Sequence, residues 1–357
     1  MLTRREAPSA YGPARAGSTE GGAARGAGPA IAVLGAGLMG RWHLQAARRL
    51  GARLLAVADP DTARARALAG PDLPVFPGLD EMLRAVRPDV LHLCSPTASH
   101  GPAIEAAIAR GVHVFAEKPL AADAAQTRRL ADLARAAGLR LCPVHQYAFQ
   151  DAVERVIAGR DRAGALRLVD LDFFSAGAAG AAAADLPGIA ADILPHPAAI
   201  LQRLWPDRPL GSLDWTIRAA GQGGWQIAAP LEGALVRITL SLTARPTRAA
   251  LTLWGERGAW EADLFHGYAR FRHGTATRRS KMLRPFADAA GQGGHAAVNL
   301  AGRALRREPA YPGLRALTAA FYASLSGGAE PIPPDRAVAV AELRDLFLAR
   351  IAGGAAR

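Results

Sequence analysis

The feature that most constrains the fold is a glycine-rich turn placed between a strand pattern and a helix pattern. An apolar run over Ala30–Leu34 predicts a buried strand, and Gly35-Ala36-Gly37-Leu38-Met39-Gly40 follows at once, opening a helical pattern over Leu38–Leu50. In such a turn the first glycine permits the tight bend, the second permits close approach of a ligand, and the third permits close packing of helix on strand. Because unpaired N–H groups at a helix start favour an anion, the turn predicts a pyrophosphate site.

A carboxylate after this turn indicates that the pyrophosphate belongs to a dinucleotide. Asp59 ends the second predicted strand, nineteen residues after Gly40. A carboxylate there accepts hydrogen bonds from the adenosine ribose hydroxyls and repels a 2′-phosphate, which favours NAD over NADP. Arg64 and Arg66 lie close enough in sequence that NADP stays open as the cofactor.

The residues that follow alternate strand and helix patterns as far as about residue 150. Strands separated by helices require right-handed crossovers and a parallel sheet. We therefore predict an α/β fold in which residues 30–150 form a Rossmann dinucleotide-binding domain with a mainly parallel sheet. The further strands are expected at Arg53–Ala58, Val75–Phe76, Val90–Cys94, His113–Ala116 and Arg140–Val144, and the helices at Thr62–Ala69, Leu79–Val86, Ser99–Arg110 and Ala122–Ala137.

After residue 150 the pattern changes to strands with little helix between them. We predict that residues 151–357 form an α+β domain with an open, largely antiparallel sheet that exposes one face. Residues 1–29, rich in Gly, Ala, Ser and Pro, predict a disordered tail, and 176–184 a mobile loop. The strands are expected at Gly164–Ser175, Asp214–Ala219, Ala234–Thr243, Ala249–Trp254, Trp260–Phe265 and Tyr268–Phe271, and helices at Gly313–Leu325 and Asp335–Ile351.

A lysine follows the fifth predicted strand, in Glu117-Lys118-Pro119. Ligands of open α/β sheets bind outside the carboxyl ends of the strands, so Lys118 is expected to point into the cofactor crevice. An ammonium there stabilises developing alkoxide charge on a substrate oxygen. The only other lysine is Lys281, so in a chain that otherwise uses arginine a compact, titratable cation is selected here, unless its position is due to chance.

The third candidate is the segment Asp192-Ile193-Leu194-Pro195-His196. If the segment is one helix, Asp192 and His196 share a face, and the carboxylate stabilises the charged imidazole of a general acid/base. Taken alone, such a pair is more often a helix cap or a satisfied core histidine. Pro195 weakens the prediction of a continuous helix.

Taken in order, these motifs resemble the glucose–fructose oxidoreductase/inositol dehydrogenase/MocA family, from about residue 31 to residue 350. Glu117-Lys118-Pro119 matches the most diagnostic tripeptide of that family, and Asp192 and His196 fit its D-x-x-x-H pair. The resemblance also covers the turn through His43, the loop Ser95-Pro96-Thr97-Ala98-Ser99-His100 and the turn Trp254-Gly255-Glu256-Arg257-Gly258.

The resemblance implies hydride transfer between nicotinamide and a substrate carbon, with Lys118, Asp192 and His196 as the catalytic trio. It implies that Glu117 supports the cofactor site, that Ser95, Pro96, Thr97 and His100 lie against the nicotinamide half, and that the C-terminal sheet makes a homodimer or homotetramer. This chain departs from the family at Tyr147-Ala148-Phe149, where arginine-phenylalanine is common, and at Ala199. We therefore expect a pocket less suited to sugars, or one that uses Tyr147 and Gln146 instead.

The charge of the chain, +12, is carried mostly by arginine, which together with abundant Ala and Gly is typical of a GC-rich genome. The densest basic stretch, 270–284, is expected to be a solvated loop, with an anion-binding surface as the alternative. It has no accompanying signature of a specific nucleic-acid binder. No run is apolar enough to span a membrane, and Arg4-Arg5 is not followed by the apolar segment of an export signal. With only Cys94 and Cys142, expected as reduced core thiols outside any metal site, we predict a cytoplasmic protein.

Two other functions stay open at the level of sequence. One is a catalytically silent NAD-binding sensor, although Lys118 and His196 are both present. The other is an enzyme that oxidises and re-reduces its small-molecule substrate during an elimination or hydrolysis, so that no reduced cofactor accumulates.

Overall fold

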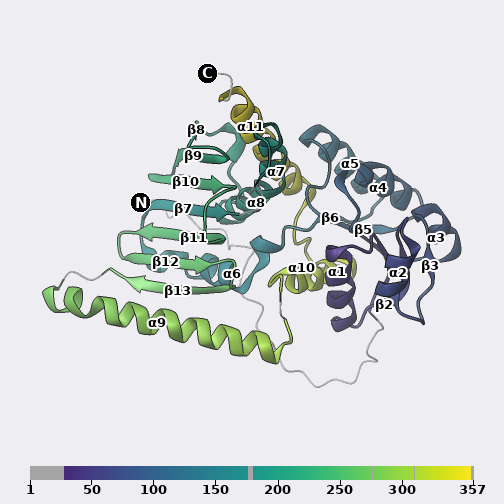
Figure 1. The fold of residues 1–357 in the computed structure, drawn as a ribbon, viewed down its shortest axis with the longest axis horizontal. Coiled ribbons are helices and arrows are strands. Elements are labelled where there is room, and N and C mark those ends of the chain that lie inside the picture. The colour runs from purple at the N-terminus through teal and green to yellow at the C-terminus, as the bar shows by residue number, and fades with distance from the viewer. Residues whose placement is uncertain (1–27, 176–179, 275–276, 309, 355–357) are drawn as a thin grey trace, which may run out of the picture.

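Two sheets with helices between them make up the computed structural model, which describes residues 28–175, 180–274, 277–308 and 310–354 (Figure 1). The tail expected over residues 1–29 therefore lies almost wholly outside the described residues, as do 176–179 of the expected mobile loop. The last two residues of that loop, 183 and 184, form a 3₁₀ turn with Asp185.

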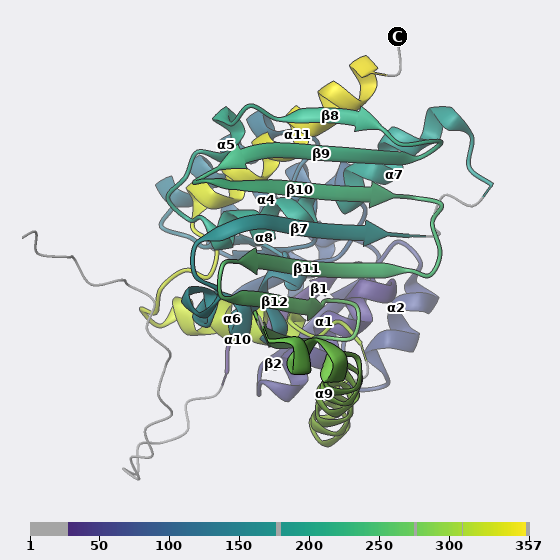
Figure 2. The same ribbon diagram turned by 90° about the vertical axis from the view of Figure 1, so that its left-hand side faces the viewer.

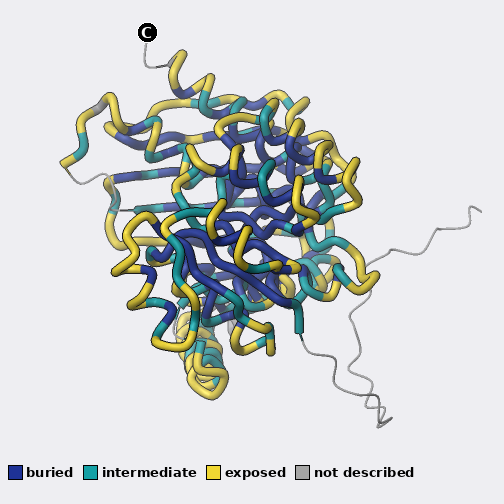
Figure 3. The backbone as a smooth tube through the Cα atoms, turned by 90° about the vertical axis from the view of Figure 1, so that its right-hand side faces the viewer, coloured by how far each residue is buried: buried dark blue, intermediate teal, exposed yellow. Residues whose placement is uncertain are grey.

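The first sheet is six-stranded and parallel, in the order β3-β2-β1-β4-β5-β6. Figure 3 shows it as the buried centre of its half of the molecule, because helices cover both faces of such a sheet. Its strands are β1 (Ala30–Leu34), β2 (Arg53–Ala58), β3 (Val75–Phe76), β4 (Val90–Leu93), β5 (His113–Ala116) and β6 (Leu141–Pro143). Its helices are α1 (Leu38–Arg49), α2 (Thr62–Ala69), α3 (Leu79–Ala85), α4 (His100–Ile108) and α5 (Ala124–Ala136).

The second sheet is seven-stranded, in the order β13-β12-β11-β7-β10-β9-β8. Helices cover the side that faces the first sheet, and Figure 2 looks onto the other, open side. Its strands are β7 (Leu166–Phe174), β8 (Thr216–Ala219), β9 (Gly224–Leu231), β10 (Ala234–Ser241), β11 (Arg248–Gly255), β12 (Gly258–Asp263) and β13 (Tyr268–His273). The remaining helices are α6 (Asp151–Ala158), α7 (Leu186–Ile193), α8 (Pro195–Leu204), α9 (Arg278–Leu305), α10 (Leu314–Leu325) and α11 (Pro334–Gly354).

The prediction of an α/β fold with a parallel sheet and then a largely antiparallel one is confirmed, with two corrections. The central pair β7 and β10 is parallel, because the chain between them crosses back through α7 and α8 before it re-enters the sheet. The strand β9 was not predicted, and it pairs with β10 through a two-residue turn at Glu232 and Gly233.

Two helices near the C-terminus return to the first half of the molecule. Helix α10 lies beside α1, and α11 runs between α5 and α8. Their contacts bring residues above 310 next to the carboxyl ends of the parallel strands, where the predicted site lies.

Candidate functional site

The glycine turn has the geometry that the sequence predicts. Gly35 has φ +99°, and a Cβ there would lie 2.6 Å from the backbone of Cys94. A Cβ at Gly40 would lie 2.0 Å from the Gly35 carbonyl oxygen, so helix and turn pack at a distance that only glycine allows. A Cβ at Gly37 would meet no atom within 4 Å, so that side of the turn is open for a ligand.

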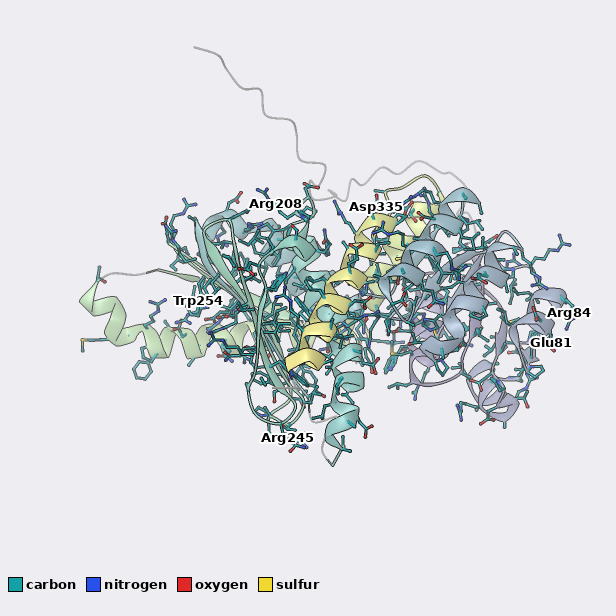
Figure 4. All side chains as sticks on the ribbon, turned by 90° about the horizontal axis from the view of Figure 1, so that it is seen from above. Glu81, Arg84, Arg208, Arg245, Trp254 and Asp335 are labelled. Carbon is teal, nitrogen blue, oxygen red and sulfur yellow. The ribbon has the colours of Figure 1, made fainter. Side chains whose placement is uncertain are left out.

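A cavity of about 1130 Å³ opens at this turn. Gly35, Gly37, Leu38 and Met39 line it, as do Ser95 and Pro96 from the loop after β4. Its outer part is lined by charged side chains, including Asp61, Arg64, Glu81 and Arg84, the last two labelled in Figure 4. The open glycine, the helix start and the cavity volume fit a bound dinucleotide.

Asp59 lies on the wall of this cavity, and the protein already holds its carboxylate in place. Its Oδ2 accepts from the Ala36 N–H at 2.7 Å, and its Oδ1 accepts from the Asp61 N–H at 2.9 Å. A carboxylate oxygen has two lone pairs, so each oxygen keeps one for a ligand hydroxyl. Asp61 forms an ion pair with Arg64 at 3.2 Å, which draws that guanidinium toward a carboxylate.

The loop after β4 is fastened to the chain around Lys118 by His100. The His100 ring is buried, with Nε2 2.9 Å from the Ser95 carbonyl oxygen and Nδ1 3.1 Å from the Pro119 carbonyl oxygen. Since its ring faces backbone on both sides, the structure places His100 as a clamp of the loop. Thr97 begins the short 3₁₀ turn Thr97–Ser99 and is not among the cavity-lining residues.

Lys118 lies at the carboxyl end of β5 and reaches across to the second half of the chain. Its Nζ donates to the backbone carbonyl of Asp192 at 2.7 Å. His196, in the first turn of α8, is buried beside the Tyr147 ring at 4.5 Å between centroids. The Phe173 ring is stacked with the imidazole at 6.2 Å between centroids and also contacts the Tyr147 ring.

The expected pairing of Asp192 with His196 is wrong in this structure. The two residues belong to different helices, α7 and α8, because Pro195 starts a new helix. Asp192 is exposed, and no hydrogen bond or ion pair within the described residues joins its carboxylate to His196. The Asp192 backbone, rather than its side chain, is what contacts Lys118.

His145, which the sequence analysis did not single out, completes this cluster. Burial lowers the pKa of His145 to about 3, with Lys118 and Arg344 acting in the same direction. Burial, Lys118 and His145 lower the pKa of His196 well below its ordinary value. Both imidazoles are therefore neutral at pH 7, the opposite of the charged ring that the Asp192 pairing predicts.

Several polar atoms near this cluster are buried without a hydrogen-bond partner in the described chain. They include Nδ1 of both His145 and His196, and Oε1 of Gln146. Buried polar groups are normally paired, so an unpaired set at the carboxyl edge of a sheet indicates a place for a polar ligand. Position at the end of β6 is the sequence signal that could have identified His145.

Glu117 is not among the residues that line the cavity. Its carboxylate is buried, and Oε1 lies 3.0 Å from Nε2 of His43, the histidine of the family-like turn. The predicted site residues thus form two groups. One lies along the dinucleotide cavity, and the other surrounds Lys118 and His196.

The basic stretch 270–284 is not a solvated loop. It comprises part of β13 and the start of α9, and Arg270 and Arg272 form ion pairs with Glu261. Arg272 also pairs with Asp288 at 2.8 Å. These two arginines are neutralised by acids that flank the stretch, while the side chains of 278–281 lie outside the described ones.

Cys94 and Cys142 are unpaired thiols, as predicted. Within the described residues no helix is long and apolar enough to cross a membrane, and no three His, Cys, Asp or Glu side chains are grouped to hold a metal ion.

Comparison with known families and proteins agrees with this geometry. Residues 30–145 match the family model described as "Oxidoreductase family, NAD-binding Rossmann fold". Inositol 2-dehydrogenase 4 of Saccharopolyspora erythraea is 40% identical over 118 residues, which are 32% of this chain and 35% of that protein. A dTDP-3,4-didehydro-2,6-dideoxy-alpha-D-glucose 3-reductase of Streptomyces violaceoruber is 40% identical over 109 residues, 29% of this chain and 32% of that protein. The sequence matches thus span about a third of these relatives.

Solved structures resemble the chain over nearly its whole length. The WlbA dehydrogenase from Bordetella pertussis, solved with NADH and UDP-GlcNAcA, has a TM-score of 0.69 at 16% identity and covers 91% of this chain and 96% of its own. UDP-N-acetylglucosamine 3-dehydrogenase GnnA from Acidithiobacillus ferrooxidans has a TM-score of 0.66 at 18% identity, covering 91% and 97%. At these identities the likeness establishes the fold of both halves.

Proposed function

We propose that the chain is an NAD-dependent dehydrogenase or reductase, since residues 30–145 match the model of the Gfo/Idh/MocA oxidoreductase family with its NAD-binding Rossmann fold. Its substrate is a sugar, polyol, nucleotide sugar or similar small molecule with a hydroxyl or carbonyl carbon. The similar proteins named as inositol dehydrogenase, deoxyglucose reductase and nucleotide-sugar dehydrogenase support this class of substrate.

One observation carries the proposal. A cation and two neutral imidazoles meet at the carboxyl edge of the parallel sheet, beside a cavity suited to a dinucleotide. When bound there, the nicotinamide gives or takes the hydride. The protein must then hold the substrate oxygen and move its proton.

The cluster around Lys118 divides these tasks. Lys118, anchored at 2.7 Å on the Asp192 carbonyl, keeps two further N–H groups for a substrate oxygen on which negative charge develops. His196 is neutral because its pKa is lowered, so it accepts the hydroxyl proton during oxidation and returns it during reduction. In this proposal Asp192 fixes Lys118 through its backbone, and Tyr147 and Gln146 border the substrate.

We further propose that NAD is preferred over NADP. Both oxygens of Asp59 are already oriented by backbone N–H groups and keep one lone pair each for ribose hydroxyls. A 2′-phosphate would bring its charge against this carboxylate, and Arg64, which lines the same cavity, is paired with Asp61.

The experiment is a substrate screen over cyclic polyols, sugars and nucleotide sugars with NAD⁺, in which NADH absorbance and product are both measured. Product together with stoichiometric NADH is expected. Product without NADH would indicate a recycled cofactor and an elimination or hydrolysis. Dinucleotide binding without product from any class would favour a sensor and overturn the enzymatic proposal.

The open face of the second sheet supports a proposal of self-association. Leu235 and Trp254 are 44% and 42% exposed, and both are paired with Leu168, so the three form an apolar row across β10, β7 and β11. Trp254 is labelled on this open side in Figure 4. We propose a homodimer or homotetramer through this face, which Trp254→Arg would dissociate in light-scattering measurements. The unpaired thiols favour a reducing, cytoplasmic location.

A further inference from the structure

A line of four polar side chains, three buried and the fourth, Tyr322, half-buried, connects Glu117 to the C-terminal helix α10. Glu117 Oε1 lies 3.0 Å from His43 Nε2, and His43 Nδ1 lies 3.1 Å from His92 Nδ1. His92 Nε2 then lies 2.9 Å from the Tyr322 hydroxyl. The four residues come from β5, α1, β4 and α10, so the line crosses the core between helix and sheet.

These rings differ from those of the Lys118 cluster in one respect. Both ring nitrogens of His43 and of His92 have a partner, and both rings are fully buried. Phe115 packs against both imidazoles at 5.2–5.4 Å between centroids. Unlike His145 and His196, this pair is satisfied entirely by the protein itself.

The donor and acceptor roles along the line follow from one another. An ionised Glu117 can only accept, so His43 Nε2 carries a hydrogen. A neutral His43 then accepts at Nδ1, which requires a hydrogen on Nδ1 of His92. A neutral His92 accepts at Nε2, so the Tyr322 hydroxyl donates. Burial lowers the pKa of His92 well below its ordinary value, with His43 acting in the same direction, which keeps that ring neutral.

We propose that Tyr322, His92 and His43 are positioning residues that hold the Glu117 carboxylate oriented beside the dinucleotide site. Glu117 lies one residue before Lys118 and next to Cys94, which lines the cavity. The pKa of the Cys94 thiol is raised by burial and by the Glu117 charge. The line makes dinucleotide binding depend on α10, a helix from the far end of the chain. This functional consequence rests on the proposed function, whereas the hydrogen-bond order does not.

The hydrogen-bond order is tested on the ligand-free protein by NMR of ¹⁵N-labelled histidine rings at pH 7. The expected result is opposite tautomers, with hydrogen on Nε2 of His43 and on Nδ1 of His92. His43→Gln and His92→Gln variants assign the two rings among the nine histidines. Hydrogen on Nε2 of His92, or a charged His92, would overturn the inference.

The positioning role is tested by Tyr322→Phe, which removes one hydroxyl and keeps the ring. Loss of this donor is expected to weaken NAD⁺ binding about fivefold, the usual effect of one neutral hydrogen bond, and to disturb the His92 signals. Tyr268→Phe, on β13 and outside the line, is the matched control and should change neither. A Tyr322→Phe protein with normal affinity and unchanged tautomers contradicts the proposal even if its melting temperature falls.

Glu117→Gln separates charge from hydrogen bonding. The amide oxygen still accepts from His43, so the two tautomers are expected to persist while NAD⁺ affinity falls. Unchanged affinity would overturn the role given to the Glu117 charge. If the tautomers are as expected and NAD⁺ binds, yet no substrate turns over, the enzymatic proposal fails and the positioning line remains.

Discussion

The two ends of the candidate site differ in how far the protein has satisfied its own polar groups. At the dinucleotide end, Asp59 is bonded by two backbone N–H groups, and the glycine turn is fixed by contacts that leave no room for a Cβ at Gly35 or Gly40. At the Lys118 end, His145, Gln146 and His196 each keep a buried polar atom without a partner. The first end is preorganised to bind, and the second is left with groups that only a substrate would pair.

The difference has an electrostatic side as well. Charged residues line the outer cavity in both signs, where water screens them. Around Lys118, burial keeps both imidazoles neutral, and the positive charges that act on His145 are those of Lys118 and Arg344. In the proposed function, Lys118 stabilises a substrate oxygen that becomes negative during the reaction.

The largest effect is expected from removing that charge. Lys118→Ala should lower turnover by about 10²–10³, the usual loss for one donor aimed at a developing oxyanion. Dinucleotide affinity should not change, since Lys118 is not among the residues lining the cavity. Single-turnover rates, NADH titration and melting temperature measured together check this prediction.

Lys118→Arg is the control that keeps the positive charge but changes the shape of the charged group. Its turnover should also fall, because a planar guanidinium is a poor substitute for a compact ammonium. The competing view is that Lys118 only ties β5 to the Asp192 carbonyl. A variant that melts earlier but turns over normally when folded would support that view and contradict ours.

The second prediction separates binding from folding within the glycine turn. Gly37→Ala adds a methyl where no protein atom lies within 4 Å, so stability should be nearly unchanged while dinucleotide affinity falls about tenfold or more, or ~1.4 kcal/mol. Gly40→Ala forces a methyl to within 2.0 Å of the Gly35 carbonyl oxygen and should lower both the stability and the dinucleotide affinity. Both variants are measured by thermal unfolding and by NAD⁺ titration. Normal NAD⁺ affinity of Gly37→Ala would contradict the proposal that the pyrophosphate binds at this turn.

The third prediction concerns the choice between the two dinucleotides. Asp59→Ser should weaken NAD⁺ binding about thirtyfold, through loss of two hydrogen bonds of ~1 kcal/mol each, and bring the affinities for NAD⁺ and NADP⁺ closer together. Asp61→Ala is the matched control, because it releases Arg64 without touching Asp59 and should improve only NADP⁺. Titration of both dinucleotides decides, and tighter NADP⁺ than NAD⁺ in the wild type would refute the preference.

How well sequence patterns predicted these regions depends on which physical signal each one carries. Parallel strands buried on both faces are continuous apolar runs bounded by Gly and Pro, so β1, β2, β3 and β5 begin and end where predicted. Strand β9 was not predicted because Gly224–Leu231 contains glycine, alanines and a proline, which are weak strand formers. Helix α9 was not predicted because Pro285 and the glycines of Gly291–Gly294 interrupt its helical pattern of apolar residues.

The candidate site was predictable where its residues follow strands and less so where they meet across the chain. Glu117, Lys118 and the glycine turn all sit at strand ends, which a sequence motif can mark. His145 and the Tyr322–His92–His43 line depend on tertiary packing between segments up to 230 residues apart, and no spacing signals them. The i, i+4 argument for Asp192 and His196 failed because it assumed one helix across Pro195.

The smallest effect should appear in the pH dependence of stability. His92, His145 and His196 all have pKa values lowered by burial, that of His145 to about 3. Below pH 6.5 these residues take up protons in the unfolded chain but not in the folded one, so the free energy of unfolding decreases as pH falls from 6.5 toward 5. Each contributes up to about 1.4 kcal/mol per pH unit. His145→Gln should reduce this slope in denaturant titrations. Cys142→Ala, three residues earlier in β6, should not reduce it, because burial raises the pKa of that thiol out of this pH range. A slope that His145→Gln leaves unchanged would mean that the ring is already protonated in the folded protein. The contrast between a neutral reaction end and a charged binding end would then be lost.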